Sequence, residues 1–255
     1  EYEAGVIKYF KSFVKSGNVY RSKKPVYWCT HCRTALAEAE VEYHEHESHS
    51  ITVRFPMPDP PDFLKPYAGD GLSVLIWTTT PWTIPANLAI ALHPQAEYAG
   101  FEMDNQRLIA ARRLIPLIAE TAQKEFHEIF VFPGARLEGA HARHPLYDRE
   151  SLLITADYVM LDQGTGCVHT APGHGEEDYQ SGLRYKLDIY SPVEDDGRFD
   201  SSTGPYAGMH INEGIAAVRK DPDTGGFLLP KEPYPLSYPH CWRCRNPVIF
   251  RATAQ

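Results

Sequence analysis

The sequence lacks any long apolar run. No stretch approaches the roughly 18–20 consecutive apolar residues that a helix needs to cross a bilayer, which argues against a helical membrane span. The first residues, 1–5, carry no basic segment followed by an apolar one, so no secretory signal is expected. The chain also begins without Met, which suggests an excised fragment, although a processed chain would look the same. We therefore expect a cytoplasmic protein with no membrane partner.

The sequence also lacks an excess of basic charge. Lys and Arg number 25 against 33 Asp and Glu, which gives a net charge of −8. A protein that held nucleic acid mainly through its phosphates should carry a basic face. Any contact with nucleic acid must therefore be local, or supplied largely by another part of a longer protein.

Cysteine is scarce, with five residues, but four of them form a pattern. Cys29 and Cys32 make one Cys-x-x-Cys pair, and Cys241 and Cys244 make a second near the opposite end. Two such turns form a tetrahedral sulfur cage, the preferred structural site for zinc. Redox pairs or plain thiols are the alternatives, although the thioredoxin-like βαβ context of a redox pair is missing. Cys167, in an apolar strand, fits a buried small residue better than a nucleophile.

A metal held by these four thiolates would tie the two ends of the chain together. It would leave no open ligand position, so its role would be structural. We expect residues 1–45 and 235–255 to form a small base with two zinc knuckles. Residues 46–234 would then be an insertion held on that base.

Proline and glycine, at 21 and 18 residues, predict many short elements joined by turns. Period-two patterns and apolar runs predict strands at 26–28, 50–55, 72–78, 98–103, 107–111, 130–132, 152–156 and 166–169. Helical spacing predicts helices at 5–15, 114–126, 176–186 and, capped by Asn212, up to 220. Residues 33–42 have a helical composition, with strand-like alternation at their end. Together these elements predict a mainly β fold of the α+β class, with a closed or nearly closed barrel and peripheral helices.

The most distinctive stretch is Trp77–Asn87, which reads Trp-Thr-Thr-Thr-Pro-Trp-Thr-Ile-Pro-Ala-Asn. Three threonines leave a buried strand and meet a proline, which ends ladder pairing. Hydroxyls and amides placed this way can bind a polar group and orient a water. A polar strand end with a proline turn is the simpler interpretation.

A second stretch runs from Gly164 through a short strand to His169 and on into a helix that begins with Glu176, Glu177 and Asp178. Acidic residues suit a helix N-terminus electrostatically, which explains one or two of them. The functional interpretation is that one carboxylate faces a pocket and holds a cationic group, such as an α-ammonium.

Together these stretches resemble the isoleucyl-tRNA synthetases. The resemblance rests on Trp77–Thr83, on Gly164–Asp178, on Tyr238–Cys244 (Tyr-Pro-His-Cys-Trp-Arg-Cys) and on Lys24–Cys29 followed by 33–43. It covers nearly the whole chain, in the family's order. Related valyl and leucyl enzymes typically have Thr-Thr-Arg-Pro where this chain has Thr-Thr-Thr-Pro. The nucleotide-activating signatures His-Ile-Gly-His and Lys-Met-Ser-Lys-Ser are absent, so this chain is not expected to make aminoacyl-tRNA alone.

The resemblance implies a β-barrel editing hydrolase. It would remove valine wrongly attached to the 3′ end of isoleucine tRNA, or valine from its adenylate, as part of a larger isoleucine-tRNA ligase. The implied catalytic residues are Thr79, Thr80 and Asp178, with Asp178 gripping the α-ammonium. The implied substrate-binding residues are Trp77, Thr78, Thr83, Asn87, His169 and Asp178. His169 would help to exclude isoleucine, and no general base is evident.

Two other functions fit parts of the pattern. The chain could be a zinc-stabilised tRNA-binding module without catalysis. It could also be a metallohydrolase that uses His44, His46 and His49, although that segment is acidic and expected to be solvated.

Overall fold

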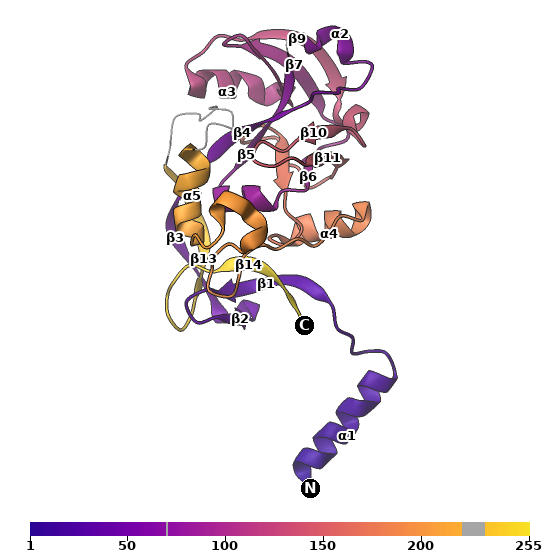
Figure 1. Cartoon of the computed structure of the whole chain (residues 1–255), viewed down its shortest axis with the longest axis vertical. Helices are drawn as coiled ribbons and strands as arrows, with labels where there is room; N and C mark the ends of the chain where they lie inside the picture. The colour runs from indigo at the N-terminus through magenta and orange to yellow at the C-terminus, as the bar shows by residue number, and fades with distance from the viewer. Residues whose placement is uncertain (70, 221–232) are drawn as a thin grey trace.

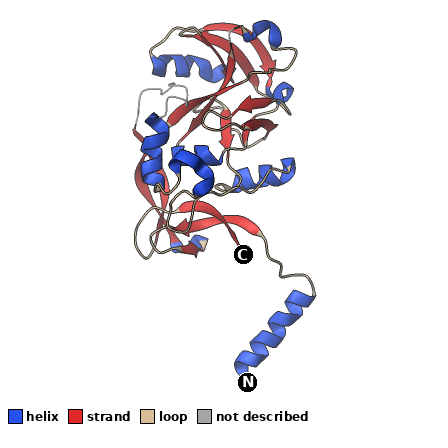
Figure 2. Ribbon diagram, in the orientation of Figure 1, coloured by secondary structure: helices blue, strands red, loops and turns tan. Residues whose placement is uncertain are grey.

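The computed structural model describes residues 1–69, 71–220 and 233–255, and leaves out the side chains at 47–49, 219–220 and 233–236. It has mixed α+β architecture, with a curled sheet at one end and a small base at the other (Figures 1 and 2). The strands are β1 (Lys23–Cys29), β2 (Thr34–Leu36), β3 (Val41–His49), β4 (Ile51–Pro56), β5 (Leu72–Thr78), β6 (Ala89–Leu92), β7 (Glu97–Met103), β8 (Gln106–Ala111), β9 (His127–Pro133), β10 (His141–Arg143), β11 (Glu150–Thr155), β12 (Cys167–Thr170), β13 (Pro233–Cys241) and β14 (Ile249–Ala254). The α-helices are α1 (Tyr2–Lys15), α2 (Lys65–Ala68), α3 (Ile115–Ala122), α4 (Glu176–Tyr185) and α5 (Ile211–Lys220). Short 3-10 helices are η1 (Glu38–Glu40), η2 (Pro81–Ala86), η3 (Arg112–Leu114), η4 (Gly134–Leu137) and η5 (Ser201–Tyr206).

The large sheet is a strongly curled half-barrel. Its order is β10-β11-β6-β12-β5-β8-β7-β9, and β4 pairs with the free side of β5. Within the described residues β10, β9 and β4 each pair with a single strand, so the expected closed or nearly closed barrel is corrected to a half-barrel. The α+β class is confirmed. Three of the pairings are parallel: β11 with β6, β12 with β5, and β5 with β8.

Local sequence explains why the central elements form. β5 carries the nearly continuous apolar run predicted at 72–78, as a strand buried on both faces requires. The β7–β8 hairpin turns at Asp104 and Asn105, which adopt positive φ of 53° and 60°. Asp and Asn tolerate that left-handed conformation better than most residues, so a two-residue turn closes there.

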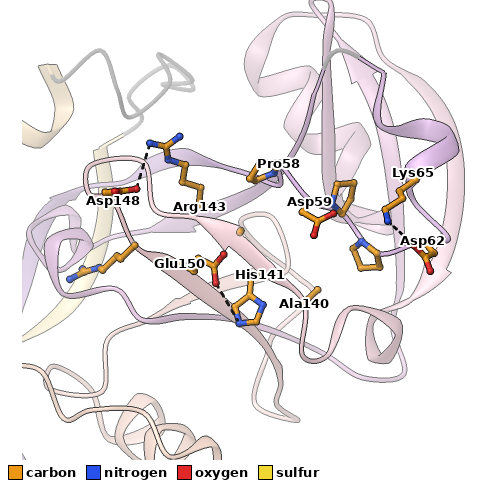
Figure 3. Close-up of a pocket in the computed structure, with 13 residues that line it drawn as sticks. Pro58, Asp59, Asp62, Lys65, Ala140, His141, Arg143, Asp148 and Glu150 are labelled. Carbon is orange, nitrogen blue, oxygen red and sulfur yellow. Dashed lines mark hydrogen bonds and ion pairs between the residues drawn. The ribbon is translucent and has the colours of Figure 1, made fainter.

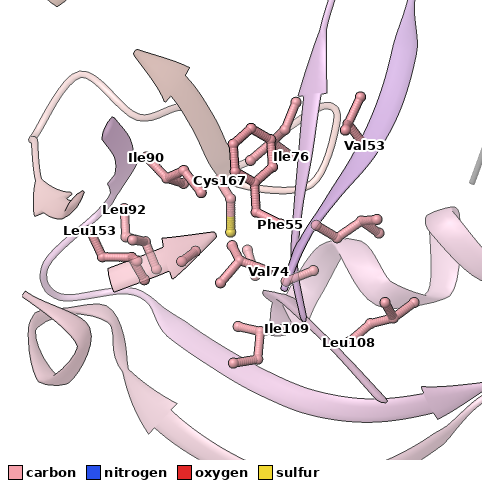
Figure 4. Packing of buried hydrophobic residues seen from close by; sticks show 14 of the residues in the cluster. Val53, Phe55, Val74, Ile76, Ile90, Leu92, Leu108, Ile109, Leu153 and Cys167 are labelled. Atoms are coloured by element: carbon pink, nitrogen blue, oxygen red, sulfur yellow. The ribbon is translucent and has the colours of Figure 1, made fainter. Parts of the chain in front are cut away.

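The hydrophobic core fills the concave side of the half-barrel. Figure 4 shows side chains from neighbouring strands meeting there, among them Phe55, Val74, Ile90 and Leu153. Cys167 lies with them at 1% exposure, which agrees with its predicted role as a small buried residue. Burying each such aliphatic or aromatic side chain contributes about 1.5–3 kcal/mol. The sheet is therefore a rigid support for residues at its strand ends.

The base joins the two ends of the chain. β1 pairs antiparallel with β14 and with β2. β3 and β13 form a two-stranded ribbon that leads from the base toward the half-barrel (Figure 1). The predicted boundaries at 45/46 and 234/235 both fall within this ribbon.

Helix α1 confirms the prediction at 5–15, but it projects away from the rest of the chain (Figure 1). None of its residues is buried, and Tyr9 and Phe10 are 73% and 56% exposed. Within the described residues its apolar face packs against no other element. No helix in the described part of the chain is long and apolar enough to span a membrane.

Several local predictions need correction. Residues 33–42 form β2, η1 and the start of β3, because pairing with β1 overrides their helical composition. Asn212 lies inside α5, which begins at Ile211. The sequence patterns missed β6 and η2. The 3-10 helix η2 contains Pro85 in its interior, where proline disfavours a helix.

Candidate functional site

The four paired cysteines converge in the base. Their sulfur atoms all lie within 4.8 Å of one another, and Sγ of Cys29 lies 3.4 Å from Sγ of Cys244. Each pair is followed by an arginine in the left-handed conformation, Arg33 with φ 52° and Arg245 with φ 62°. The two turns thus have matching backbone geometry, and both aim their thiols at one point.

This cluster could hold a metal ion. Four thiolates around zinc at about 2.3 Å would lie roughly 3.8 Å apart in a tetrahedron, which fits the spacing observed. Burial raises the pKa of the Cys29 thiol to about 12, a cost that a bound cation would offset.

The histidines of the ribbon form no comparable set. Among the described residues, the four cysteines are the one group of three or more potential ligands close enough to share an ion. The rings of His44 and His46 instead contact His240 edge-on, with centroids 5.1 and 6.0 Å apart. The side chain of His49 lies outside the described residues.

The threonine turn follows directly from the end of β5. The strand stops at Thr78, and Pro81 begins η2, so the backbone folds back on itself. The Oγ1 atom of Thr78 accepts a hydrogen bond from the Thr80 amide at 3.0 Å and lies 3.2 Å from Thr80 Oγ1. Thr80 Oγ1 lies 3.2 Å from Thr83 Oγ1. Three of the predicted threonines therefore form one hydrogen-bonded group.

His169 joins this group from the neighbouring strand. β12 runs parallel to β5, with Val168 opposite Trp77, so both strands end at the same edge of the sheet. His169 Nε2 lies 2.7 Å from Thr83 Oγ1, and its Nδ1 lies 2.9 Å from Nδ2 of Asn87. His169 and Asn87 are 6% and 0% exposed. The structure thus brings Thr78, Thr80, Thr83, Asn87 and His169 together in one buried polar cluster.

Burial lowers the pKa of His169 to about 3, helped by the nearby charges of His174 and Arg149. The imidazole is therefore neutral at physiological pH. Both ring nitrogens already have hydrogen-bond partners within the chain, so neither is available to a substrate without rearrangement.

Sequence patterns missed Ser151, which completes the cluster. It is fully buried in β11, and its hydroxyl donates to Asn87 Oδ1 at 2.6 Å. The sequence carries only a weak signal for this role, a single hydroxyl residue directly before the apolar strand predicted at 152–156.

Asp178 and Trp77 lie on the other side of the strand pair. They line a cavity of about 300 Å³ together with Tyr158, Gln163 and Val168. Successive side chains in a strand point to opposite faces, so Trp77 and Thr78 diverge, as do Val168 and His169. A ligand that touched both Asp178 and the threonines would have to straddle the strand ends.

The carboxyl group of Asp178 nevertheless lies close to that shared edge. Its Oδ2 accepts a hydrogen bond at 2.9 Å from the amide of Ala171, the first residue after β12. Desolvation raises the pKa of Asp178 to about 7, and the charge of Glu177 adds to the rise while the Ala171 amide opposes it. This carboxyl group therefore changes charge near neutral pH.

Thr79 and Thr80 open onto a different cavity, a groove of about 570 Å³ between the threonine turn and the cysteine base. From the base it is lined by Thr30, His31, Arg33 and Asn246, and from elsewhere by Trp82, Arg198, His210 and Tyr238. The guanidinium groups of Arg33 and Arg198 each lie 3.8 Å from the carboxylate of Asp196. Two cations share one anion, so this part of the groove is locally positive in an acidic chain.

A further cavity of about 590 Å³ lies beside β10 and β11 (Figure 3). Its charged groups are largely paired with each other. His141 faces Glu150 at 3.9 Å, and Lys65 faces Asp62 at 2.8 Å. This pairing makes the cavity a weaker candidate for a charged ligand than the groove.

Comparison with known proteins identifies the family. The model for tRNA synthetases class I (I, L, M and V) matches residues 1–255. The chain belongs to this family. It is 53% identical to isoleucine–tRNA ligases from Petrotoga mobilis and from Fervidobacterium nodosum, over its whole length in both cases. The resemblance inferred from the motifs is thereby confirmed. The chain spans about 27% of the length of these synthetases.

Solved structures show the same fold in part of this synthetase family. The cytosolic leucyl-tRNA synthetase editing domain of P. knowlesi matches 72% of this chain with a TM-score of 0.56 and 11% identity, and 96% of that domain is covered. The equivalent P. falciparum domain matches 71% with a TM-score of 0.55 and 9% identity, at 98% coverage. At these identities the likeness concerns the fold alone.

Proposed function

We propose that this chain is the editing part of an isoleucine–tRNA ligase, and that it hydrolyses the ester between valine and the 3′ end of isoleucine tRNA. The observation that carries the proposal is the buried cluster of threonines and His169 at the ends of β5 and β12. It offers hydroxyls at the end of a rigid sheet, with a carboxyl group beside the same edge. Valyl-adenylate is a second substrate of the same site.

Each residue of the site has a role in this proposal. The Asp178 carboxylate binds the α-ammonium of valine through a charge-assisted hydrogen bond. Thr79 and Thr80, on the groove wall, orient the ester and the attacking water, and Thr78 and Thr83 hold them in place. Trp77 and Asn87 shape the site. Since the aminoacyl ester is already activated, oriented water and hydrogen bonding suffice without a general base in the chain.

Size discrimination explains why such a site is needed. In a hydrophobic pocket one methylene is worth only about 1–3 kcal/mol, the well-known reason that isoleucine enzymes use a second sieve. A sieve must be narrow and rigid, which strand ends provide better than loops. In this proposal His169 forms part of the sieve, because its ring is buried and is held rigid by hydrogen bonds at both nitrogens.

The groove is the proposed path of the tRNA 3′ end. It leads to Thr79 and Thr80, carries the unbalanced positive charge of Arg33 and Arg198, and contains the aromatic rings of Trp82 and Tyr238. Positive charge and aromatic rings are what single-stranded nucleic acid binds. The rest of the acidic surface offers little to a tRNA, so the remainder of the synthetase supplies most of the affinity and the isolated chain binds weakly.

The four-cysteine cluster is proposed to hold structural zinc. All four ligand positions are taken by Cys29, Cys32, Cys241 and Cys244, so the ion would have no place for a substrate. In this organisation residues 1–45 and 235–255 form the base and 46–234 the editing unit. The exposed apolar face of α1 would pack on the remaining synthetase, in the cytoplasm.

The test is deacylation of isoleucine tRNA carrying valine, measured beside the same tRNA carrying isoleucine, with this chain and its Asp178→Asn variant. We expect faster loss of valine than of isoleucine, and a loss of about 10- to 100-fold in rate on substitution, because a charge-assisted hydrogen bond disappears. Asp188→Asn, at an exposed site outside the cluster, is the control. If neither ester is cleaved by this chain or by the complete synthetase, the proposal fails and a non-catalytic tRNA-binding module remains.

A further inference from the structure

The orientation of the Asn87 side chain follows from its neighbours. The carbonyl oxygen of Ala89 can only accept a hydrogen bond, and it lies 2.8 Å from one end of the Asn87 amide. That end must therefore be the NH₂ group. The other end, the amide oxygen, accepts from the hydroxyl of Ser151 at 2.6 Å.

This orientation determines which nitrogen of His169 carries the proton. The second hydrogen of the Asn87 NH₂ group points at Nδ1 of His169, 2.9 Å away. Nδ1 must accept this bond, so it carries no hydrogen. In a neutral imidazole the proton is then on Nε2.

The opposite side of the ring leads independently to the same tautomer. The Thr83 hydroxyl donates to the carbonyl of Thr80 at 2.7 Å, so its hydrogen is already in use. Thr83 Oγ1 must then accept from His169 Nε2, 2.7 Å away, which requires a proton on Nε2. The carbonyl groups of Ala89 and Thr80, on opposite sides of the imidazole, thus give the same direction to every hydrogen bond in this series.

We infer that Ser151 and Asn87 lock His169 in its Nε2–H tautomer, and that Ser151 is a positioning residue of the editing site. The direction of donation runs from Ser151 to Asn87, from Asn87 to His169 and from His169 to Thr83. Thr83 Oγ1 accepts a second hydrogen bond, from the hydroxyl of Thr80, because its own hydrogen is donated to the Thr80 carbonyl. Hydrogen bonds through Asn87 and His169 therefore connect a serine on β11 to the hydroxyls of the threonine turn.

Fixing the tautomer of His169 limits the part that this residue can take in hydrolysis. A protonated His169 would carry a hydrogen on Nδ1, directly opposite the Asn87 NH₂ group. Burial disfavours the imidazolium most, and the electrostatic effects of His174 and Arg149 act in the same direction to lower the pKa of His169. His169 is therefore a neutral hydrogen-bond donor to Thr83, and it takes no proton from water. The role of Ser151 in editing rests on the proposed function, but the tautomer of His169 can be measured without substrate.

The experiment is ¹⁵N NMR of histidine-labelled protein, using the 255-residue chain. The His169 signals are assigned by their loss in His169→Gln. We expect an unprotonated Nδ1 and a protonated Nε2, both unchanged from about pH 5 to 8, where an ordinary histidine titrates. An Nδ1–H tautomer, or titration within that range, would overturn the inference even if the chain proves to edit.

Variants separate positioning from general stability. Ser151→Ala should lower the rate of valine removal by about 3- to 10-fold, the value of one buried hydrogen bond, and should broaden the His169 signals. Thr155→Val is the matched control: it removes a buried hydroxyl from the same strand, where Thr155 donates to Glu138 instead. It should leave the tautomer and the rate unchanged. Equal effects of the two substitutions would mean that Ser151 has only a structural role. If Ser151→Ala fails to fold, the wild-type tautomer still decides the main inference.

Discussion

The Sγ atoms of Cys29 and Cys244 lie 3.4 Å apart, although 215 positions separate them in the sequence. The pair closes nearly the whole chain into one loop, with the half-barrel inside it. A metal ion at this point would hold the base together without touching the threonine turn. Its contribution should therefore be to folding, and only indirectly to activity.

Removing the metal should unfold the base. We expect about one zinc per chain, and we expect chelation or Cys244→Ser to lower the Tm measured by circular dichroism, because the binding energy of a structural zinc is folding energy. Cys167→Ala removes a thiol outside the cluster and should leave the zinc content unchanged. Activity lost on chelation with an unchanged melting curve would instead indicate a catalytic metal.

The activity should depend on the ionisation of Asp178. Its carboxylate is needed to bind the α-ammonium, and its pKa is raised to about 7 by burial. The kcat/KM for valine removal should therefore rise with pH through about 7, since this quantity reports groups of the free enzyme. Asp178→Asn should abolish that inflection along with most of the activity. A pH profile unchanged by the substitution would contradict the assignment.

The same raised pKa has a consequence for stability. The folded chain holds a proton on Asp178 that the unfolded chain releases from about pH 3.9. The free energy of unfolding should thus fall as pH rises from there to about 7, and the part due to Asp178 should be absent in Asp178→Asn. Urea titrations at several pH values measure this difference. An unchanged difference between the two proteins across the range would refute it.

Replacing His169 with a smaller residue should weaken the discrimination between valine and isoleucine. His169→Ala leaves space beside Thr83 and removes two hydrogen bonds. We expect isoleucine to be removed about 10-fold faster relative to valine, on the scale of one methylene in a pocket. His141→Ala, at an exposed position on β10, is the control. If the ratio of the two rates stays the same, His169 does not bound the pocket.

The positive charge of the groove can be tested with two matched arginines. Arg33 lines the groove and Arg143 the cavity beside β10; their side chains are 61% and 62% exposed, and each lies 3.8 Å from an aspartate. Arg33→Gln should weaken binding of the tRNA 3′ end and reduce its salt dependence by about one phosphate contact. Arg143→Gln should do neither. Equal effects of both would show that the groove has no special role.

Much of the chemistry is present in local sequence. The paired cysteines, the apolar strand at 72–78, the threonine turn and the family resemblance are all readable without a structure. These features depend on residue types at short spacing, where backbone geometry restricts the possible conformations. For the same reason the patterns at 98–111 and 176–186 predict the β7–β8 hairpin and helix α4 close to their actual positions.

Tertiary structure decided which of these residues meet. Strand order and register place His169 against Thr83 and Asn87, and bring in Ser151 from β11. The alternation of side chains along β5 and β12 separates Trp77 and Val168 from Thr78 and His169, and Asp178 of α4 lies with the first pair. Such relations depend on the pairing of strands far apart in the chain, which no local pattern specifies. The sequence thus determined the functional groups of this protein, and the packing of the sheet determined their partners and the direction of their hydrogen bonds.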